Sequence, residues 1–122
     1  MTSLEVLIVE DNQWLAASYA RGLTQAGLSV RVAANGLEAI AMIDKTLPDI
    51  ILLDVMLTAT TGFTLLHELQ SHVDLARIPV VLVTNMVEHI ALEDVQTYGV
   101  RQVIDKATVT PELLLAAVQR AL

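Results

Sequence analysis

The chain of 122 residues has no cysteine, few basic residues and no long apolar run. Without cysteine no disulfide can stabilise an exported fold, which fits the cytoplasm. Seven basic residues against 14 acidic ones give a formal net charge of −7, with no Lys/Arg cluster, which argues against direct nucleic-acid binding. No stretch approaches the roughly 18 apolar residues that span a bilayer. We therefore expect a soluble, cytoplasmic protein that contacts neither a membrane nor a nucleic acid.

The amino terminus also lacks a secretory signal. It reads Met-Thr-Ser-Leu-Glu, with neither a basic start nor an apolar stretch, and strand-like sequence follows at once. Apolar residues make up 54% of the chain, enough for one core in a chain of this length. We expect residues 1–122 to form one domain, with no output domain after it.

Five apolar or alternating stretches have the length and composition of strands. They are Leu4–Val9, Ser29–Ala33, Ile50–Asp54, Val80–Val83 and Arg101–Asp105. The third is an unbroken apolar run up to its final aspartate, and the fourth is wholly apolar before Thr84. Such runs are typical of strands that are buried on both faces of a parallel sheet.

Apolar residues spaced three and four apart predict helices between these strands. The predicted helices are Gln13–Ala26, Gly36–Thr46, Gly62–Ser71, Glu88–Tyr98 and a last helix that starts at Pro111. Asn35 and Thr110 are suited to cap two of them, and Gly27 is placed to end the first. The fourth is the weakest, because several of its residues are only moderate helix formers.

The alternation of strands and helices with short connections predicts an α/β fold. Right-handed crossovers then favour a flavodoxin-like five-stranded parallel sheet in the order 2-1-3-4-5, with helices on both faces.

Three acidic residues follow two strands that are neighbours in this order. Glu10 and Asp11 follow the first strand, and Asp54 ends the third. Adjacent strands lie about 5 Å apart, and two unit charges at that distance repel by roughly 3 kcal/mol at an effective dielectric constant of about 20. A hard divalent cation would offset this repulsion, and Mg²⁺ is bound in this manner, by carboxylates, a carbonyl and water.

The fourth and fifth strands bring a hydroxyl and an ammonium group to the same edge. They are carried by Thr84 and Lys106. A metal and a lysine can neutralise phosphoryl oxygens, a hydroxyl can hydrogen-bond one of them, and a carboxylate can be the nucleophile. The set of residues therefore suits phosphoryl transfer.

In these residues the chain resembles the receiver domain of two-component response regulators, of the chemotaxis-regulator type, over essentially its full length. The matching features are the Glu10-Asp11 pair, Asp54, Gly62 eight residues later, Thr84, the Tyr98-Gly99 turn and Lys106. The resemblance implies that Asp54 is the phospho-acceptor. It also implies that Glu10, Asp11, Asp54 and the backbone carbonyl of Met56 hold Mg²⁺, that Thr84 binds the phosphoryl group and that Lys106 pairs with it.

The resemblance further implies a signalling switch in a phosphorelay. A histidine kinase, a phosphotransfer protein or a small phosphodonor would load Asp54. An unknown output partner would read the surface formed by helix four, strand five and helix five. Such a phosphoprotein catalyses its own phosphotransfer and dephosphorylation without being a turnover enzyme, and would be a monomer or a weak, phosphorylation-linked dimer.

Other functions stay open at this point. They are an unphosphorylated adaptor with the receiver fold and a passive phosphate sink. A haloacid-dehalogenase-like phosphatase fits less well, because that family needs a second acid two residues after the nucleophile, where this chain has Met56. A dinucleotide carrier would need a glycine-rich first turn, which is missing.

The chain departs from the family pattern at four positions. Thr58 and Ala107 replace prolines, Asn85 replaces a small residue, and Val103 stands where an aromatic switch residue is usual. A non-proline cis bond costs about 2.5 to 4 kcal/mol, so we predict a trans Lys106–Ala107 peptide. Val103 has one strongly preferred rotamer, so we expect the signal to come from backbone movement after Thr84.

Overall fold

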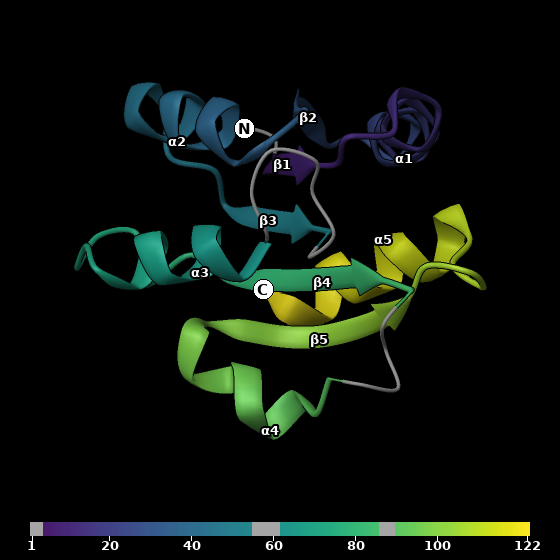
Figure 1. The fold of residues 1–122 in the computed structure, drawn as a ribbon. Helices are drawn as coiled ribbons and strands as arrows, with labels where there is room; N and C mark the ends of the chain where they lie inside the picture. Colours follow the sequence, from purple (N-terminus) through teal and green to yellow (C-terminus); the bar gives the residue numbers. More distant parts are fainter. Residues whose placement is uncertain (1–3, 55–61, 86–89) are drawn as a thin grey trace.

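The computed structural model describes residues 4–54, 62–85 and 90–122. Five parallel strands form one sheet in the order β2-β1-β3-β4-β5 (Figure 1), as predicted. Their bounds are β1 Glu5–Val9, β2 Ser29–Ala33, β3 Ile50–Leu53, β4 Val80–Thr84 and β5 Val100–Asp105. The fold is the flavodoxin-like α/β arrangement, with β3 at the centre of the sheet.

Helices connect the strands. They are α1 Gln13–Gln25, α2 Gly36–Lys45, α3 Gly62–Gln70, α4 Leu92–Val95 with the 3₁₀ turn η2 Gln96–Tyr98, and α5 Pro111–Ala121. The side chains of Asn35 and Thr110 accept hydrogen bonds from backbone N–H groups of the first turns of α2 and α5, as predicted. Asn12 caps α1 in the same way, by accepting from the N–H groups of Trp14 and Leu15.

The predicted helix Glu88–Tyr98 is wrong at its start. Ile90 and Ala91 are not helical, α4 begins only at Leu92, and the last turn narrows to 3₁₀; residues 88 and 89 lie outside the described residues. Ala91, at the cap position, offers no side-chain hydrogen bond to the first turn, so nothing compensates the moderate helix propensities. The end is as predicted, because Gly99 adopts the left-handed conformation at φ 80°.

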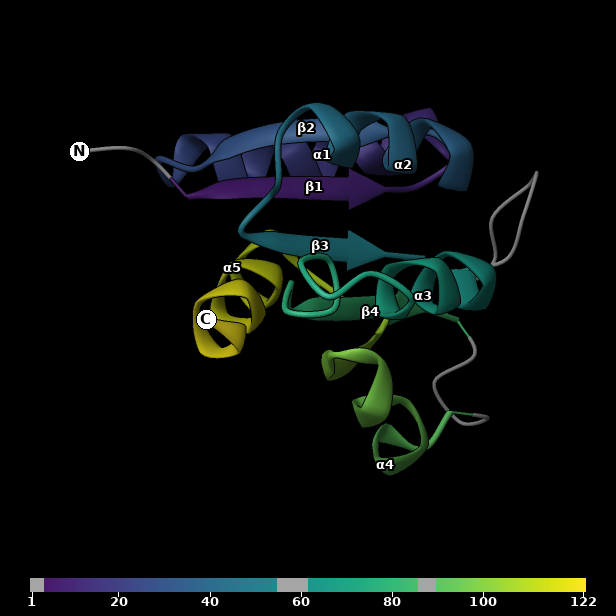
Figure 2. The same ribbon diagram turned by 90° about the vertical axis from the view of Figure 1, so that its left-hand side faces the viewer.

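The helices cover the sheet on both faces (Figure 2). The helices α1 and α5 pack on one face, against a buried cluster that includes Val6, Ile8, Ile50, Leu52, Val81 and Val83. The helices α2 and α3, together with Val95, pack on the other face, against a cluster that includes Leu7, Val9, Ile51, Leu53, Val80 and Leu82. Successive residues of a strand point to opposite faces, so strands covered on both sides must be apolar throughout.

The strands end together at one edge. Val9 pairs with Leu53, and Leu53 pairs with Leu82. Backbone hydrogen bonds continue the pairing beyond the strand ends, from Asp54 N to Val9 O at 3.1 Å and from Lys106 N to Thr84 O at 3.0 Å. The polar residues that follow the strands are therefore held by the sheet itself.

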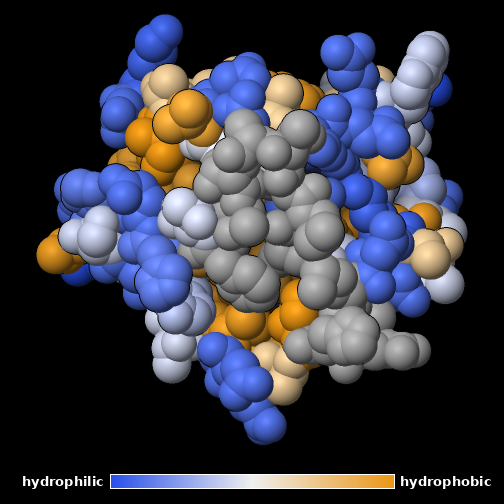
Figure 3. Space-filling model, viewed as in Figure 1, coloured by the Kyte–Doolittle hydropathy of each residue, from blue (hydrophilic) through white to orange (hydrophobic). Residues whose placement is uncertain are grey.

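Among the described residues, no helix is long and apolar enough to cross a membrane. On the face seen in Figure 3, apolar atoms gather over the seam between α2 and α3. A groove of about 630 Å³ follows this seam, and its apolar walls include Leu37, Ile40 and Leu65. The polar residues that line it, Asp44, Thr64 and Glu68, are exposed, so the groove brings no buried polar groups together.

Candidate functional site

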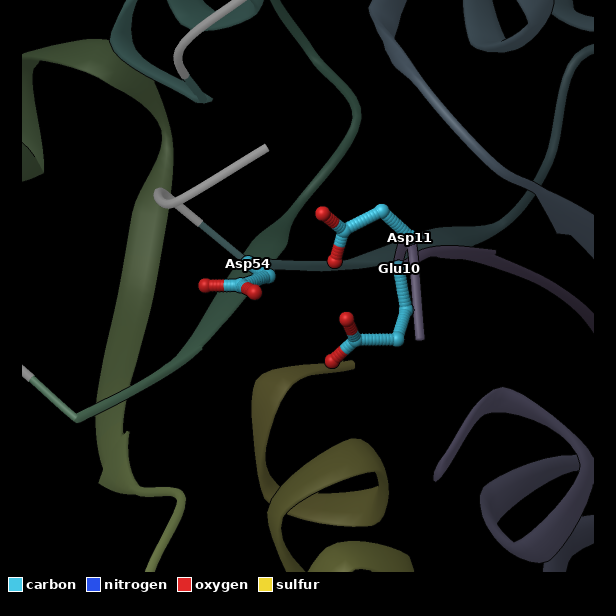
Figure 4. A group of neighbouring side chains, drawn as sticks. All are labelled: Glu10, Asp11 and Asp54. Atoms are coloured by element: carbon cyan, nitrogen blue, oxygen red, sulfur yellow. The ribbon is translucent and has the colours of Figure 1, made fainter. Parts of the chain in front are cut away.

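Three carboxylates gather where β1 and β3 end (Figure 4). Glu10, Asp11 and Asp54 each offer an oxygen atom, and these oxygens lie within 4.8 Å of one another. Glu10 and Asp54 are only 3% and 4% exposed, and Asp11 is half-buried. The geometry confirms the sequence prediction that these acids converge. Carboxylates that lie so close together and are so buried need a compensating positive charge.

Lys106 supplies part of that charge. Its Nζ atom lies 2.6 Å from Glu10 Oε1 and 2.8 Å from Asp54 Oδ2, and its side chain is 11% exposed. One ammonium group therefore bridges the acids that follow β1 and β3. With all four groups ionised, the cluster keeps a net charge of −2, which a divalent cation would neutralise.

Burial and neighbouring charges shift the pKa values of Glu10 and Lys106. Burial raises the pKa of Glu10, although the hydrogen bonds from Lys106 and from the Asn12 N–H act in the opposite direction. For Lys106 burial alone would lower the pKa, but the hydrogen bonds and charges of Asp54 and Glu10 outweigh it and leave the pKa raised. The lysine thus stays protonated at neutral pH, whereas the Glu10 carboxylate takes up a proton more readily than an ordinary glutamate.

Thr84 lies at the same edge, as predicted. It is buried at the end of β4, which pairs with β3, and its carbonyl accepts the backbone hydrogen bond of Lys106. Met56, whose carbonyl belongs to the predicted metal ligands, and Thr58, one of the departures from the family pattern, lie outside the described residues.

Three of the departures from the family pattern can be placed, and Asn85 is an exposed residue of the turn after β4. The Lys106–Ala107 peptide is trans, as predicted. Val103 is half-buried in β5 and packs against the core cluster on the α2 and α3 face. Its side chain is part of the packing and presents no large group to solvent.

Asn12 is a site residue that the sequence reasoning missed. Its backbone N–H donates to Glu10 Oε2 at 3.1 Å while its side chain caps α1. An asparagine directly before a helical pattern is a recognised cap signal, and this signal could have identified it. Glu10 is consequently held at both carboxylate oxygens, by Lys106 and by Asn12.

The donor set fits Mg²⁺. Carboxylate oxygens are its preferred protein ligands, and it is usually bound through only a few of them with water completing the shell. The acids are already neighbours, so that little rearrangement is needed to share one cation. We therefore regard this edge as consistent with a Mg²⁺ site of Glu10, Asp11 and Asp54.

The fold and the site together define a class: a flavodoxin-like α/β domain with acids and a lysine at the carboxyl edge of its sheet. The chain belongs to the response regulator receiver domain family, whose model matches residues 6–119.

Individual relatives agree with this membership. The chain is 39% identical to the response regulator PleD of Caulobacter vibrioides over 82 residues, which are 67% of this chain and 18% of PleD. It is 34% identical over 108 residues to a response regulator receiver protein of Anaeromyxobacter, covering 88% of this chain and 44% of that protein. The chain thus spans less than half the length of these relatives.

Solved structures extend the likeness to nearly the whole chain. The Vibrio cholerae chemotaxis protein CheY4 superposes with a TM-score of 0.87 at 28% identity, covering 99% of this chain and 100% of that one. A putative response regulator from Chloroflexus aurantiacus has a TM-score of 0.87 at 29% identity and covers 98% of both chains.

Proposed function

We propose that this receiver domain is a phospho-accepting signalling switch in which Asp54 takes a phosphoryl group from a phosphohistidine of a histidine kinase or of a phosphotransfer protein. The observation that carries the proposal is the contact between Lys106 Nζ and Asp54 Oδ2, within a cluster of acids at the end of the central strand.

In the transfer, a carboxylate oxygen of Asp54 attacks the phosphorus atom. The P–N bond of the donor breaks, an acyl phosphate forms, and the leaving imidazole keeps the bonding electron pair. The Lys106 ammonium, already beside the nucleophile, would stabilise the negative charge on the phosphoryl oxygens. The Thr84 hydroxyl would donate a hydrogen bond to one of these oxygens. Mg²⁺ held by Glu10, Asp11, Asp54 and the Met56 carbonyl would neutralise further charge there.

Support for Asp54 over the other acids comes from position. It ends the central strand, and its carboxylate contacts the ammonium group. Glu10 also contacts Lys106, but both of its oxygens already accept hydrogen bonds. A buried aspartate beside a lysine is suited to covalent catalysis, because the lysine offsets the charge that the carboxylate gains on phosphorylation.

The test is incubation with acetyl phosphate and Mg²⁺, followed by mass determination of the intact protein. We expect one added phosphate, and none on Asp54→Asn. Asp44→Asn, on the exposed face of α2, is the matched control and should be phosphorylated like the wild type. Equal phosphorylation of the Asp54→Asn and wild-type proteins would refute the assignment.

We further propose that the phosphorylated domain signals through the face of α4, β5 and α5. The short α4, with no side-chain cap, is the element of this face that costs least to move. A passive phosphate sink is the alternative, and it is favoured by the absence of an aromatic side chain at Val103. Hydrogen exchange of residues 85–98 with and without bound beryllofluoride distinguishes the two.

A further inference from the structure

Tyr19 has a buried hydroxyl group and lines a small cavity together with two residues of the acid cluster, Glu10 and Asp54. The residue lies in the middle of α1, is 8% exposed, and packs in the core cluster on the α1 and α5 face. Its hydroxyl oxygen is fully buried and has no hydrogen-bond partner among the protein groups that the structure describes. A buried phenol in this state loses its hydrogen bonds to water without replacement, and native structures rarely leave such groups unsatisfied.

A small cavity beside Tyr19 offers a solution. Its volume is about 10 Å³, and its walls are Ile8, Val9, Glu10, Tyr19, Leu52, Leu53, Asp54 and Val83. A volume of roughly 10 to 15 Å³ accommodates one water molecule, which needs two to four polar partners. Among the residues that line this cavity, Tyr19, Glu10 and Asp54 have polar side chains.

Electrostatics make the phenol a donor in this setting. Burial raises the pKa of Tyr19, the charge of Lys106 acts against this, and the charges of Glu10 and Asp54 add to it. The hydroxyl group is thus close enough to the site to sense all three charges, and it keeps its proton at neutral pH. Glu10 and Asp54, as carboxylates, are acceptors.

We propose that a single water molecule occupies this cavity, accepts a hydrogen bond from the Tyr19 hydroxyl, and donates hydrogen bonds to the carboxylates of Glu10 and Asp54. This gives the water three hydrogen bonds, the number typical of a buried water. Tyr19 becomes a positioning residue, which helps to hold two ligands of the proposed Mg²⁺ site from below. This second part of the inference rests on the proposed function, whereas the water site itself does not.

The hydration of the cavity is tested on the metal-free protein. Tyr98→Phe leaves Tyr19 as the only tyrosine, because the chain has two, so that tyrosine signals then report on Tyr19 alone. In this variant we expect a nuclear Overhauser effect between the Tyr19 ring and a long-lived water, and a Raman tyrosine doublet of a hydrogen-bond donor. A phenol with no water contact and the Raman signature of an unbonded hydroxyl would overturn the water site.

Thermal unfolding of Tyr19→Phe gives a second readout, again without metal. Removing a hydroxyl that has a water partner should lower Tm relative to the wild type. Removing an unsatisfied hydroxyl should leave Tm unchanged or raise it, which would contradict the proposal. Tyr98→Phe is the matched control, since it deletes a hydroxyl that lies 3.3 Å from His67 Nε2 at an exposed position.

The positioning role is tested by Mg²⁺ titration in a calorimeter. Outer-shell partners of metal ligands commonly change affinity by about 10- to 100-fold, and for a contact through water we expect Tyr19→Phe to weaken Mg²⁺ binding about tenfold. Tyr98→Phe should bind like the wild type. Unchanged affinity in Tyr19→Phe would refute the positioning role. If the wild type itself bound no Mg²⁺, the proposed metal site would fail, while the metal-free experiments would still decide the water site.

Discussion

Lys106 reaches Asp54 across an intervening strand. The lysine follows β5 and the aspartate follows β3, and β4 lies between them in the sheet; nevertheless Lys106 Nζ is 2.8 Å from Asp54 Oδ2. The backbone of Lys106 is fixed to the end of β4 by its hydrogen bond to Thr84 O, so that the side chain extends over that strand end. The positive charge that the proposed phosphorylation of Asp54 would require is therefore already in place beside its carboxylate.

Replacing Lys106 by methionine should destabilise the metal-free protein. Removing one partner of a buried ion pair leaves uncompensated charge and typically costs about 3 to 5 kcal/mol; the carboxylates of Glu10 and Asp54 would be left facing each other. We expect a loss of about 3 kcal/mol in the free energy of unfolding by urea. Saturating Mg²⁺ should restore more stability to Lys106→Met than it adds to the wild type.

Lys45→Met is the matched control, because Lys45 is the other lysine of the chain and is exposed at the end of α2. Its stability should stay within about 0.5 kcal/mol of the wild type. Equal stabilities of the two variants would show that the ion pairs of Lys106 contribute nothing net.

Asp11→Ala should weaken Mg²⁺ binding. Asp11 is the most solvent-accessible of the three acids and makes a natural entry point for a hydrated cation. Trp14, three residues later and 87% exposed, is the only tryptophan, and its fluorescence should follow the titration. Asp44→Ala serves as control, and calorimetry gives the affinities. Identical affinities for the wild type and Asp11→Ala would place the metal elsewhere.

Mg²⁺ affinity should fall with acidification at a higher pH than ordinary carboxylates would allow. Burial raises the pKa of Glu10 from its usual 4.5, and a proton on this carboxylate competes directly with the metal. As the pH falls from neutral towards 4.5, Glu10 takes up a proton and the Mg²⁺ affinity decreases. Calorimetric titrations over this range should show the decline, and Glu10→Gln should bind weakly at every pH. A pH-independent affinity down to 4.5 would contradict the raised pKa.

The raised pKa of Glu10 also affects the stability of the metal-free protein. The folded protein holds a proton on Glu10 more tightly than the unfolded chain does. The stability that Glu10 contributes is therefore fully present below pH 4.5 and is lost as the pH rises through the pKa of Glu10 in the folded protein. Mg²⁺ should therefore stabilise the fold most at neutral pH.

Beryllofluoride binding should alter hydrogen exchange in residues 85–98. The four-residue α4 and the single 3₁₀ turn after it are short, and Ala91 caps them without a side-chain hydrogen bond. Such segments open at low free-energy cost, so that a new contact at Thr84 can shift their equilibrium. In α1 and α2, whose caps are bonded, exchange should change little. An unchanged pattern in residues 85–98, with beryllofluoride bound, would favour a passive phosphate acceptor.

Much of this architecture could be predicted because a few strong physical signals agree. The apolar runs ending at Asp54 and Thr84 mark strands covered on both faces, and the alternation with helices fixes the strand order. Once the order is known, residues that follow the strands must meet at one edge. Glu10, Asp54 and Lys106 were placed together on this argument, and their contacts confirm it.

Other features depend on three-dimensional detail that a one-dimensional pattern does not contain. The start of α4 was predicted too early because apolar spacing continues through Ile90, while the missing cap at Ala91 decides against a helix there. From the sequence, Tyr19 is only one of several residues on the inward face of α1. Helical spacing predicts the direction of a side chain but not how far it reaches. That Tyr19 lines one small cavity with Glu10 and Asp54 could be found only from the structure.

The order of the sheet also bears on how the protein folds. Glu10, Asp54, Thr84 and Lys106 follow or end four different strands, and the successive separations along the chain are 44, 30 and 22 residues. They meet only when β1, β3, β4 and β5 have paired. Contacts between distant parts of a chain form late, because the entropy of closing the intervening loops is lost before they form. A nascent or partly folded chain would thus have no complete acceptor site, so the topology alone would prevent the proposed phosphorylation before folding is complete.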